Sequence, residues 1–119
     1  MKFRWCTISV NNMEESIKFY KDIVGLPIDR RFASGTGAEI CFLGEGETKV
    51  ELISGPDYKS HGSVEGISLG FEAASLDEMI EFIKEKGIEM KGPYQPNPHI
   101  RFIYVKDPNG VIIQFSQSM

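Results

Sequence analysis

The chain carries Gly44-Glu45-Gly46-Glu47-Thr48-Lys49-Val50-Glu51-Leu52 and, 63 positions later, Asp107-Pro108-Asn109-Gly110-Val111-Ile112-Ile113-Gln114-Phe115. Each segment is a turn followed by residues that are typical of a strand. A helical pattern recurs at the same spacing, because Met13, Ile17, Phe19 and Tyr20 are matched by Leu76, Ile80, Phe82 and Ile83. Two copies are too few for a solenoid, so the repeat predicts two modules that close on one another.

Each copy predicts the same order of elements, β-α-β-β-β. In the first copy we expect strands at 3–10, 27–33, 37–43 and 48–54, with a helix between Asn12 and Gly25. In the second we expect strands at 66–71, 88–91, 100–106 and 111–117, with a helix between Ser75 and Gly87. Asn12 and Ser75 are each followed three residues later by Glu, which is the pattern of a capping box. The sequence therefore predicts an α+β chain with one domain over 1–119, made of module one at 1–55, a linker loop at 55–63 and module two at 64–119.

Composition narrows the classes of function. The 119 residues, 41% of them hydrophobic, suit one globular domain, and the net charge of −4 argues against a nucleic-acid partner. No apolar run is long enough to cross a bilayer, and residues 1–7 lack the apolar stretch of a signal peptide, so we expect a cytoplasmic protein with no membrane partner. Cys6 and Cys41 have no CxxC spacing and are expected to be reduced.

Two motifs, Ser16-Ile17-Lys18-Phe19-Tyr20 ahead of Gly25-Leu26 and Lys106-Asp107-Pro108-Asn109-Gly110, have the forms S-I-x-F-Y and K-D-P-x-G. With the doubled β-α-β-β-β order, they resemble the vicinal oxygen chelate superfamily, which includes glyoxalase I, extradiol dioxygenases, and the fosfomycin and bleomycin resistance proteins. The resemblance implies two modules that form a cup-shaped mixed sheet with the helices outside. It also implies a small-molecule ligand and a homodimer.

In the metal-dependent members of that superfamily, a His or Gln and a Glu from each module hold the ion. The resemblance maps these four positions to Trp5, Glu51, Gly66 and Gln114. Glu51 keeps a carboxylate and Gln114 an amide oxygen, whereas the other two positions offer no donor. A catalytic zinc ion needs about three protein ligands, so we predict no metal ligands and no cofactor, and a divalent metal is disfavoured. His61 and His99 are expected to be loop side chains that face solvent.

Period-two alternation predicts which side chains share a face with the four positions. The resemblance adds Phe102 and Tyr104, which match pocket positions in resistance-type relatives, and Cys41 as the equivalent of Tyr104 in the first copy. The predicted ligand-binding residues are Trp5, Thr7, Cys41, Glu51, Ser68, Phe102, Tyr104 and Gln114. Trp5 would offer a flat surface for a ring or a cation. Simple packing is the alternative for Trp5 and Phe102.

Three functions follow from these residues. The leading hypothesis is a protein that binds a small organic ligand of aromatic or cationic character in the cup without the usual catalytic metal. The alternative is a lyase or isomerase of glyoxalase type, metal-dependent or metal-free, in which Glu51 is the general base and Tyr104 donates a hydrogen bond to a developing oxyanion. The third is a structural or regulatory domain with a filled cup.

Overall fold

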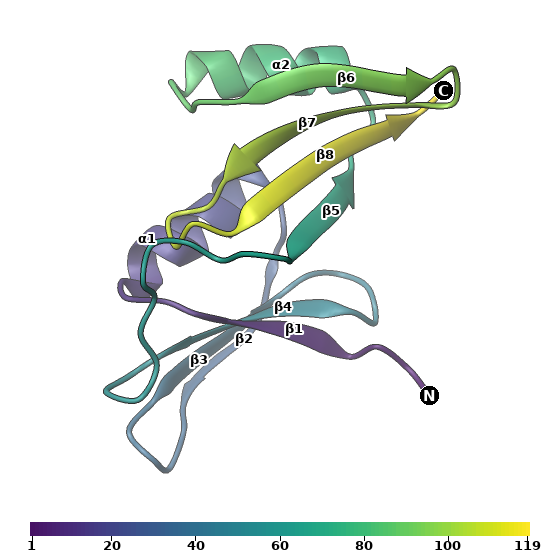
Figure 1. The fold of residues 1–119 in the computed structure, drawn as a ribbon. Helices are drawn as coiled ribbons and strands as arrows, with labels where there is room; N and C mark the ends of the chain where they lie inside the picture. Colours follow the sequence, from purple (N-terminus) through teal and green to yellow (C-terminus); the bar gives the residue numbers. More distant parts are fainter. The chain divides into compact units, whose positions relative to one another are not determined.

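The structure is a computed structural model that describes all residues 1–119. It divides into two compact units, Met1–Gly62 and Ser63–Met119, and the boundary lies at the end of the segment predicted as a linker. Each unit holds one four-stranded sheet and one helical segment (Figure 1).

None of the helices has the length and apolar character that crossing a membrane requires.

The first unit contains a sheet with the strand order β1-β4-β3-β2. Strand β1 runs parallel to β4, and the other pairs are antiparallel, so the sheet is mixed. Its elements are β1 (Trp5–Ser9), α1 (Met13–Lys18), the π-helical turn η1 (Phe19–Ile23), β2 (Ile28–Ala33), β3 (Glu39–Leu43) and β4 (Lys49–Ser54).

The second unit repeats this plan with the strand order β5-β8-β7-β6, in which β5 and β8 form the parallel pair. Its elements are β5 (Ser68–Glu72), α2 (Leu76–Glu85), β6 (Lys91–Asn97), β7 (Ile100–Lys106) and β8 (Ile112–Ser118). The predicted α+β class and the doubled β-α-β-β-β order are confirmed.

Both helices begin at the predicted caps. The Asn12 side chain accepts a hydrogen bond from the Glu15 backbone N–H at 3.0 Å, and the Ser75 hydroxyl accepts one from the Glu78 N–H at 3.2 Å. These bonds satisfy N–H groups that have no partner within the helix. The first helix then widens into η1, where the Val24 N–H reaches the carbonyl of Phe19 at 3.2 Å.

All strands but one lie within two residues of their predicted bounds. Strand β5 begins at Ser68, two residues later than predicted. Strand β6 covers Lys91–Asn97, whereas the sequence predicted 88–91, and it contains Pro93 and Pro96. Proline lacks a backbone donor, so it argues against a central strand, but β6 is the edge strand of its sheet and tolerates proline there.

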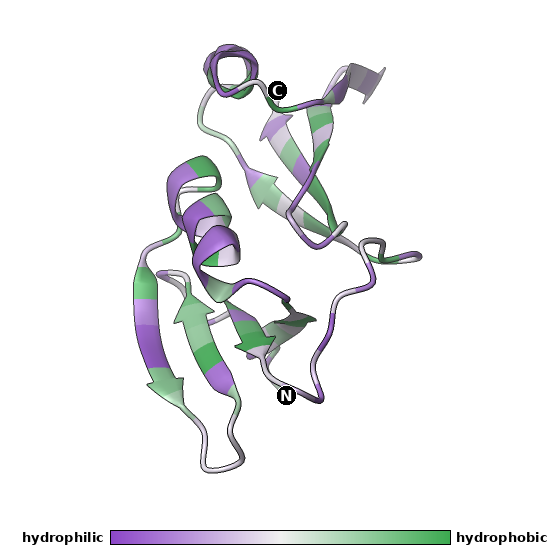
Figure 2. Ribbon diagram, turned by 90° about the vertical axis from the view of Figure 1, so that its left-hand side faces the viewer, coloured by the Kyte–Doolittle hydropathy of each residue, from purple (hydrophilic) through white to green (hydrophobic).

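The core of each unit lies between one face of its sheet and the helix. In the second unit, α2 contacts β7 and β8, and buried side chains come from all three elements: Leu76, Ile80, Ile83, Ile103, Val105, Ile113 and Phe115. Both helices and most strands carry hydrophobic as well as hydrophilic residues (Figure 2). Because alternate strand residues point to opposite faces, Phe102, Tyr104 and Gln114 lie on the other face, where they are half-buried.

Candidate functional site

In the first unit, one acidic side chain lies on the face of the sheet away from the helix. Glu51 on β4 pairs in register with Thr7 on β1, and the Thr7 hydroxyl donates a hydrogen bond to the Glu51 carboxylate. Trp5 lies two residues before Thr7, so it shares this face, and its side chain is 45% exposed. The face therefore presents a half-buried carboxylate beside a hydroxyl and an indole ring.

Arginine side chains cover the aromatic rings of this face. Trp5 meets Phe42 edge-on with ring centroids 5.5 Å apart. The guanidinium carbon of Arg4 lies 5.5 Å from the Trp5 ring centroid, and that of Arg30 lies 5.0 Å from the Phe42 centroid. These distances are those of cation–π contacts, so the chain's own cations already occupy positions that a cationic ligand would take.

The corresponding positions in the second unit form a neutral pair. Gln114 on β8 lies opposite Tyr104 on β7, and the Gln114 side-chain amide donates to the Tyr104 hydroxyl at 3.3 Å. On the other side, Gln114 faces Gly70 of β5. A Cβ atom at position 70 would lie 3.4 Å from the Gln114 side-chain oxygen, so the glycine leaves that oxygen accessible.

Three aromatic rings form a cluster on β6 and β7. Their centroids are 5.6 Å apart for Tyr94 and Phe102, 6.1 Å for Tyr94 and Tyr104, and 5.3 Å for Phe102 and Tyr104. Tyr94 is 45% exposed, and the other two rings are half-buried. No arginine or lysine covers these rings in the way that Arg30 covers Phe42. The cluster is thus an aromatic surface that remains free for contact.

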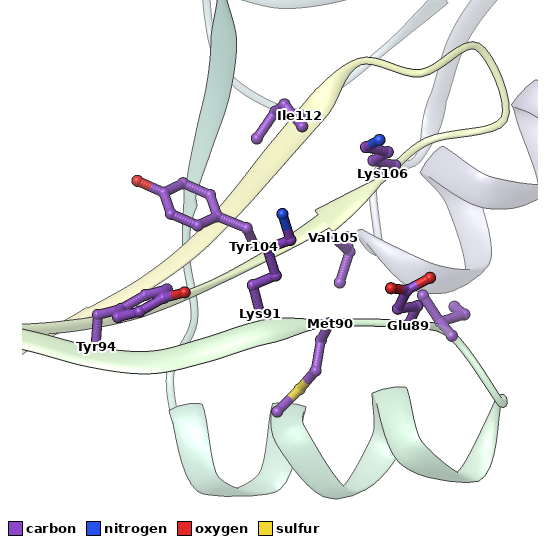
Figure 3. Close-up of a pocket in the computed structure, with 9 residues that line it drawn as sticks. Glu89, Met90, Lys91, Tyr94, Tyr104, Val105, Lys106 and Ile112 are labelled. Carbon is purple, nitrogen blue, oxygen red and sulfur yellow. The ribbon is translucent and has the colours of Figure 1, made fainter. Parts of the chain in front are cut away.

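A cavity of about 540 Å³ lies against this cluster (Figure 3). We call it the β6–β7 cavity, and its apolar and aromatic walls are Ile88, Met90, Tyr94, Tyr104, Val105 and Ile112. Three charged side chains complete the lining: Glu89, Lys91 and Lys106. A volume of this size with apolar walls and a few polar groups is typical of a site for a small organic molecule.

One predicted site residue lies on the wrong face. Cys41 was expected to be equivalent to Tyr104, but Phe42 is the residue opposite Glu51, just as Tyr104 is opposite Gln114. Cys41 pairs with Leu52 and is 0% exposed, so it belongs to the core. Burial raises the pKa of the Cys41 thiol and also that of Cys6, which leaves both as poor nucleophiles at neutral pH.

The other predicted residues lie in several places. Ser68 is exposed at the start of β5, opposite Ile112. Gly66 lies before β5 with φ of +81°, a conformation that favours glycine. His61 and His99 are exposed loop residues, as predicted. The structure therefore brings Phe102, Tyr104 and Gln114 together on one sheet, and Trp5, Thr7 and Glu51 together on the other.

The residues at the four metal positions do not fit a divalent ion. The indole of Trp5 has an N–H donor but no lone pair for a metal, and Gly66 has no side chain. The Glu51 carboxylate accepts the Thr7 hydroxyl, and the Gln114 amide is bonded to Tyr104. Within either unit, no three His, Cys, Asp or Glu side chains gather where they could hold a metal ion. One carboxylate and one amide fall short of the three ligands that a catalytic site needs.

The residues of these two faces that sequence reasoning missed include Phe42, Lys91, Tyr94 and Lys106. Tyr94 was missed because the prolines beside it obscured strand β6. Lys91 was the last residue of the strand predicted at 88–91, which is shorter than the observed strand. Phe42 was missed because the alignment of the two copies paired its neighbour Cys41 with Tyr104. Lys106 was identified as the first residue of the K-D-P-x-G motif, but it was interpreted only as part of the hairpin.

Comparison with known proteins gives a consistent result. The family model of the Glyoxalase/Bleomycin resistance protein/Dioxygenase superfamily matches residues 2–115. The Bacillus subtilis (strain 168) protein YwbC is 31% identical over 117 residues, which cover 92% of each chain. The structure is similar to that of TnmS3, an antibiotic-binding protein from Streptomyces sp. CB03234, with a TM-score of 0.82, 21% identity, and coverage of 100% of this chain and 97% of that one. It is also similar to that of the fosfomycin resistance protein FosX from Listeria monocytogenes in complex with Mn(II) and sulfate, with a TM-score of 0.73, 17% identity, and coverage of 100% and 92%. The chain belongs to the Glyoxalase/Bleomycin resistance protein/Dioxygenase superfamily.

Proposed function

We propose that this protein binds a small organic ligand with a planar, ring-containing body, and that it does so without a catalytic metal ion. The observation that carries the proposal is the uncovered cluster of Tyr94, Phe102 and Tyr104 beside the β6–β7 cavity. A flat ligand would stack on these rings with its apolar area removed from water. The Gln114 amide and the two tyrosine hydroxyls would supply the polar contacts that set its orientation.

Two further findings support a binding role. The donor set at the four metal positions is deficient, so metal-dependent chemistry of the usual kind has no support from the side chains present. One structurally similar protein, TnmS3, is an antibiotic-binding protein, and a polycyclic or aromatic antibiotic would suit the ring cluster.

The test is a calorimetric titration of the full chain against neutral and charged aromatic compounds with two or three fused rings. We expect saturable binding by at least one class of compound. Tyr104→Ala should weaken that binding, whereas Tyr58→Ala, which removes an exposed tyrosine in a loop, should leave it unchanged. If no compound binds, or if both substitutions act alike, the proposal fails.

A catalytic role for Glu51 is the second candidate, and the bond from Thr7 is the observation that favours it. That bond fixes a half-buried carboxylate on an open sheet face, as a general base would require. The reaction would be proton transfer at a carbon next to a carbonyl group. Deuterium incorporation from heavy water into such compounds would reveal it, and Glu51→Gln should abolish it. The absence of exchange across a panel of carbonyl compounds would leave binding as the function.

We also propose that the chain forms a homodimer, which family membership supports. Sedimentation velocity distinguishes a monomer of 13.4 kDa from a species of twice that mass. A single monomeric species at micromolar concentration would contradict the proposal.

A further inference from the structure

Two lysines line the β6–β7 cavity without an acidic partner. Lys91 and Lys106 are exposed, and the ammonium group of neither takes part in any of the ion pairs or side-chain hydrogen bonds of the structure. The net charge of the whole chain is −4, whereas these two free ammonium groups give one wall of the cavity a local positive charge. Glu89 is the one acidic residue in the lining.

Strand register places both lysines beside the same ring. Lys91 on β6 lies opposite Tyr104 on β7, and Lys106 is two residues further along β7, so all three side chains share one face. Ile112 lies opposite Lys106 and extends this face onto β8. Diagonal neighbours of this kind have Cα atoms about 7–8 Å apart, within reach of two flexible lysine stems. Figure 3 shows Lys91, Tyr104 and Ile112 around the same opening.

In the first unit, taken by itself, cationic side chains also accompany the aromatic rings. Arg4 and Arg30 already lie over the rings of Trp5 and Phe42, so a cationic ligand would meet like charge there. In the second unit the ring cluster is uncovered, but the ammonium groups of Lys91 and Lys106 stand beside it. A cation approaching Tyr104 would be repelled, and an anion would be attracted.

We propose that the β6–β7 cavity binds an amphipathic aromatic anion, with its ring system against Tyr104, Tyr94 and Ile112 and its carboxylate, sulfonate or phosphate group between Lys91 and Lys106. This inference rests on the proposed ligand-binding function and adds the charge of the ligand to it. Lysine ammonium groups bind such oxyanions through charge-assisted hydrogen bonds. The exposed setting makes the charge contribution modest and sensitive to salt.

The experiment compares three compounds of one shape by calorimetric titration of the full chain: 2-naphthoate, 2-naphthamide and 2-naphthylmethylammonium. At low ionic strength we expect 2-naphthoate to bind about fivefold more tightly than the amide, with the ammonium compound the weakest. Raising the salt concentration should reduce the difference between 2-naphthoate and the amide.

Matched variants locate the effect. Lys91→Met with Lys106→Met should abolish the preference for 2-naphthoate over the amide. Lys59→Met with Lys84→Met makes the same change in net charge at exposed positions outside the cavity and should keep the preference. Glu89→Gln removes the one acidic group and should strengthen 2-naphthoate binding, so the proposal remains testable if the double variant fails to fold.

The outcomes separate the two proposals. Binding of all three compounds with equal affinity would contradict the proposal that the ligand is an anion. It would still support the proposed function of binding a planar small molecule. A preference that survives in the Lys91 and Lys106 double variant, or that disappears equally in the control, would also overturn it. Failure of all three compounds to bind would overturn the anionic ligand, and the wider panel of fused-ring compounds then decides whether the binding function fails as well.

Discussion

The same position of the repeat carries a charged pair in one unit and a neutral pair in the other. In the first unit Thr7 donates to the Glu51 carboxylate, and Arg30 covers the neighbouring ring of Phe42. In the second unit Gln114 donates to Tyr104, and the rings beside it are open to a cavity. The duplicated fold thus provides two equivalent sheet faces. The aromatic rings of the second face are not covered by arginine, so they are the more available for contact with a ligand.

The hydrophobic cores of the two units should contribute similarly to the free energy of unfolding. Substitutions in these cores should have the largest effects that we predict. Leu52→Ala and Ile113→Ala each remove a fully buried side chain from equivalent strands. Each should lower the free energy of unfolding by about 2–5 kcal/mol, because a cavity remains. Urea denaturation followed by circular dichroism measures this, and Glu45→Ala at an exposed turn should change it by less than about 0.5 kcal/mol. A cost below about 1 kcal/mol for only one of the two core variants would show that the units are not packed alike.

Thiol reactivity tests which residue of β3 faces away from the helix. Cys41 is fully buried, whereas Cys6 is half-buried, so Cys41 should react with a thiol reagent about a hundredfold more slowly, after local opening. Burial raises the pKa of both thiols, so the thiolate fraction at neutral pH is small and both rates should increase with rising pH. Mass spectrometry of the labelled peptides reports each rate. Equal labelling of Cys41 and Cys6 in the native protein would indicate that Cys41 lies on the open face of the sheet, contrary to the structure.

Ring truncation distinguishes the two faces directly. Tyr104→Ala should weaken the affinity for an aromatic ligand about tenfold, because it removes the central ring of the open cluster. Phe42→Ala, at the equivalent position, should lower the stability but change the affinity by less than about twofold, since Arg30 covers that ring. Titrations of both variants measure the difference. A larger loss of affinity in Phe42→Ala would reverse the assignment of the binding face.

The charged and neutral pairs should differ slightly in their contribution to stability. Thr7→Val removes the hydroxyl that donates to Glu51 and should cost about 1 kcal/mol, since bonds to ionised groups are the stronger ones. Tyr104→Phe removes a neutral acceptor that Gln114 can replace with water, and it should cost about 0.5 kcal/mol. Thermal unfolding of both variants gives the two values, and an equal cost would show that the charge of Glu51 has no influence on the bond.

The sequence predicted the fold because its signals are local and repeated. The N-caps Asn12 and Ser75, the alternation in β4 and β8, and the hairpin at 107–110 each specify their element without reference to the rest of the chain. The candidate site was harder to predict from the sequence, because it depends on the register between strands. A shift of one residue changes the face, which is why Cys41 was assigned in place of Phe42.

Strand β6 shows a second reason for what was missed. Its seven residues include Pro93 and Pro96, which resemble a loop when read locally, and only the position of the strand at a sheet edge makes them acceptable. With the strand unrecognised, Tyr94 and Lys91 could not be placed beside Tyr104. The composition of the cavity therefore followed from tertiary pairing and not from any single motif.

The prolines of β6 also limit how this sheet can associate. Neither is among the residues that pair with β7, and each removes one backbone N–H from the outermost strand. An incoming peptide strand would find missing donors along that border and would gain little by hydrogen bonding there. Extension of the sheet by an added strand is thus discouraged along the border of the β6–β7 cavity.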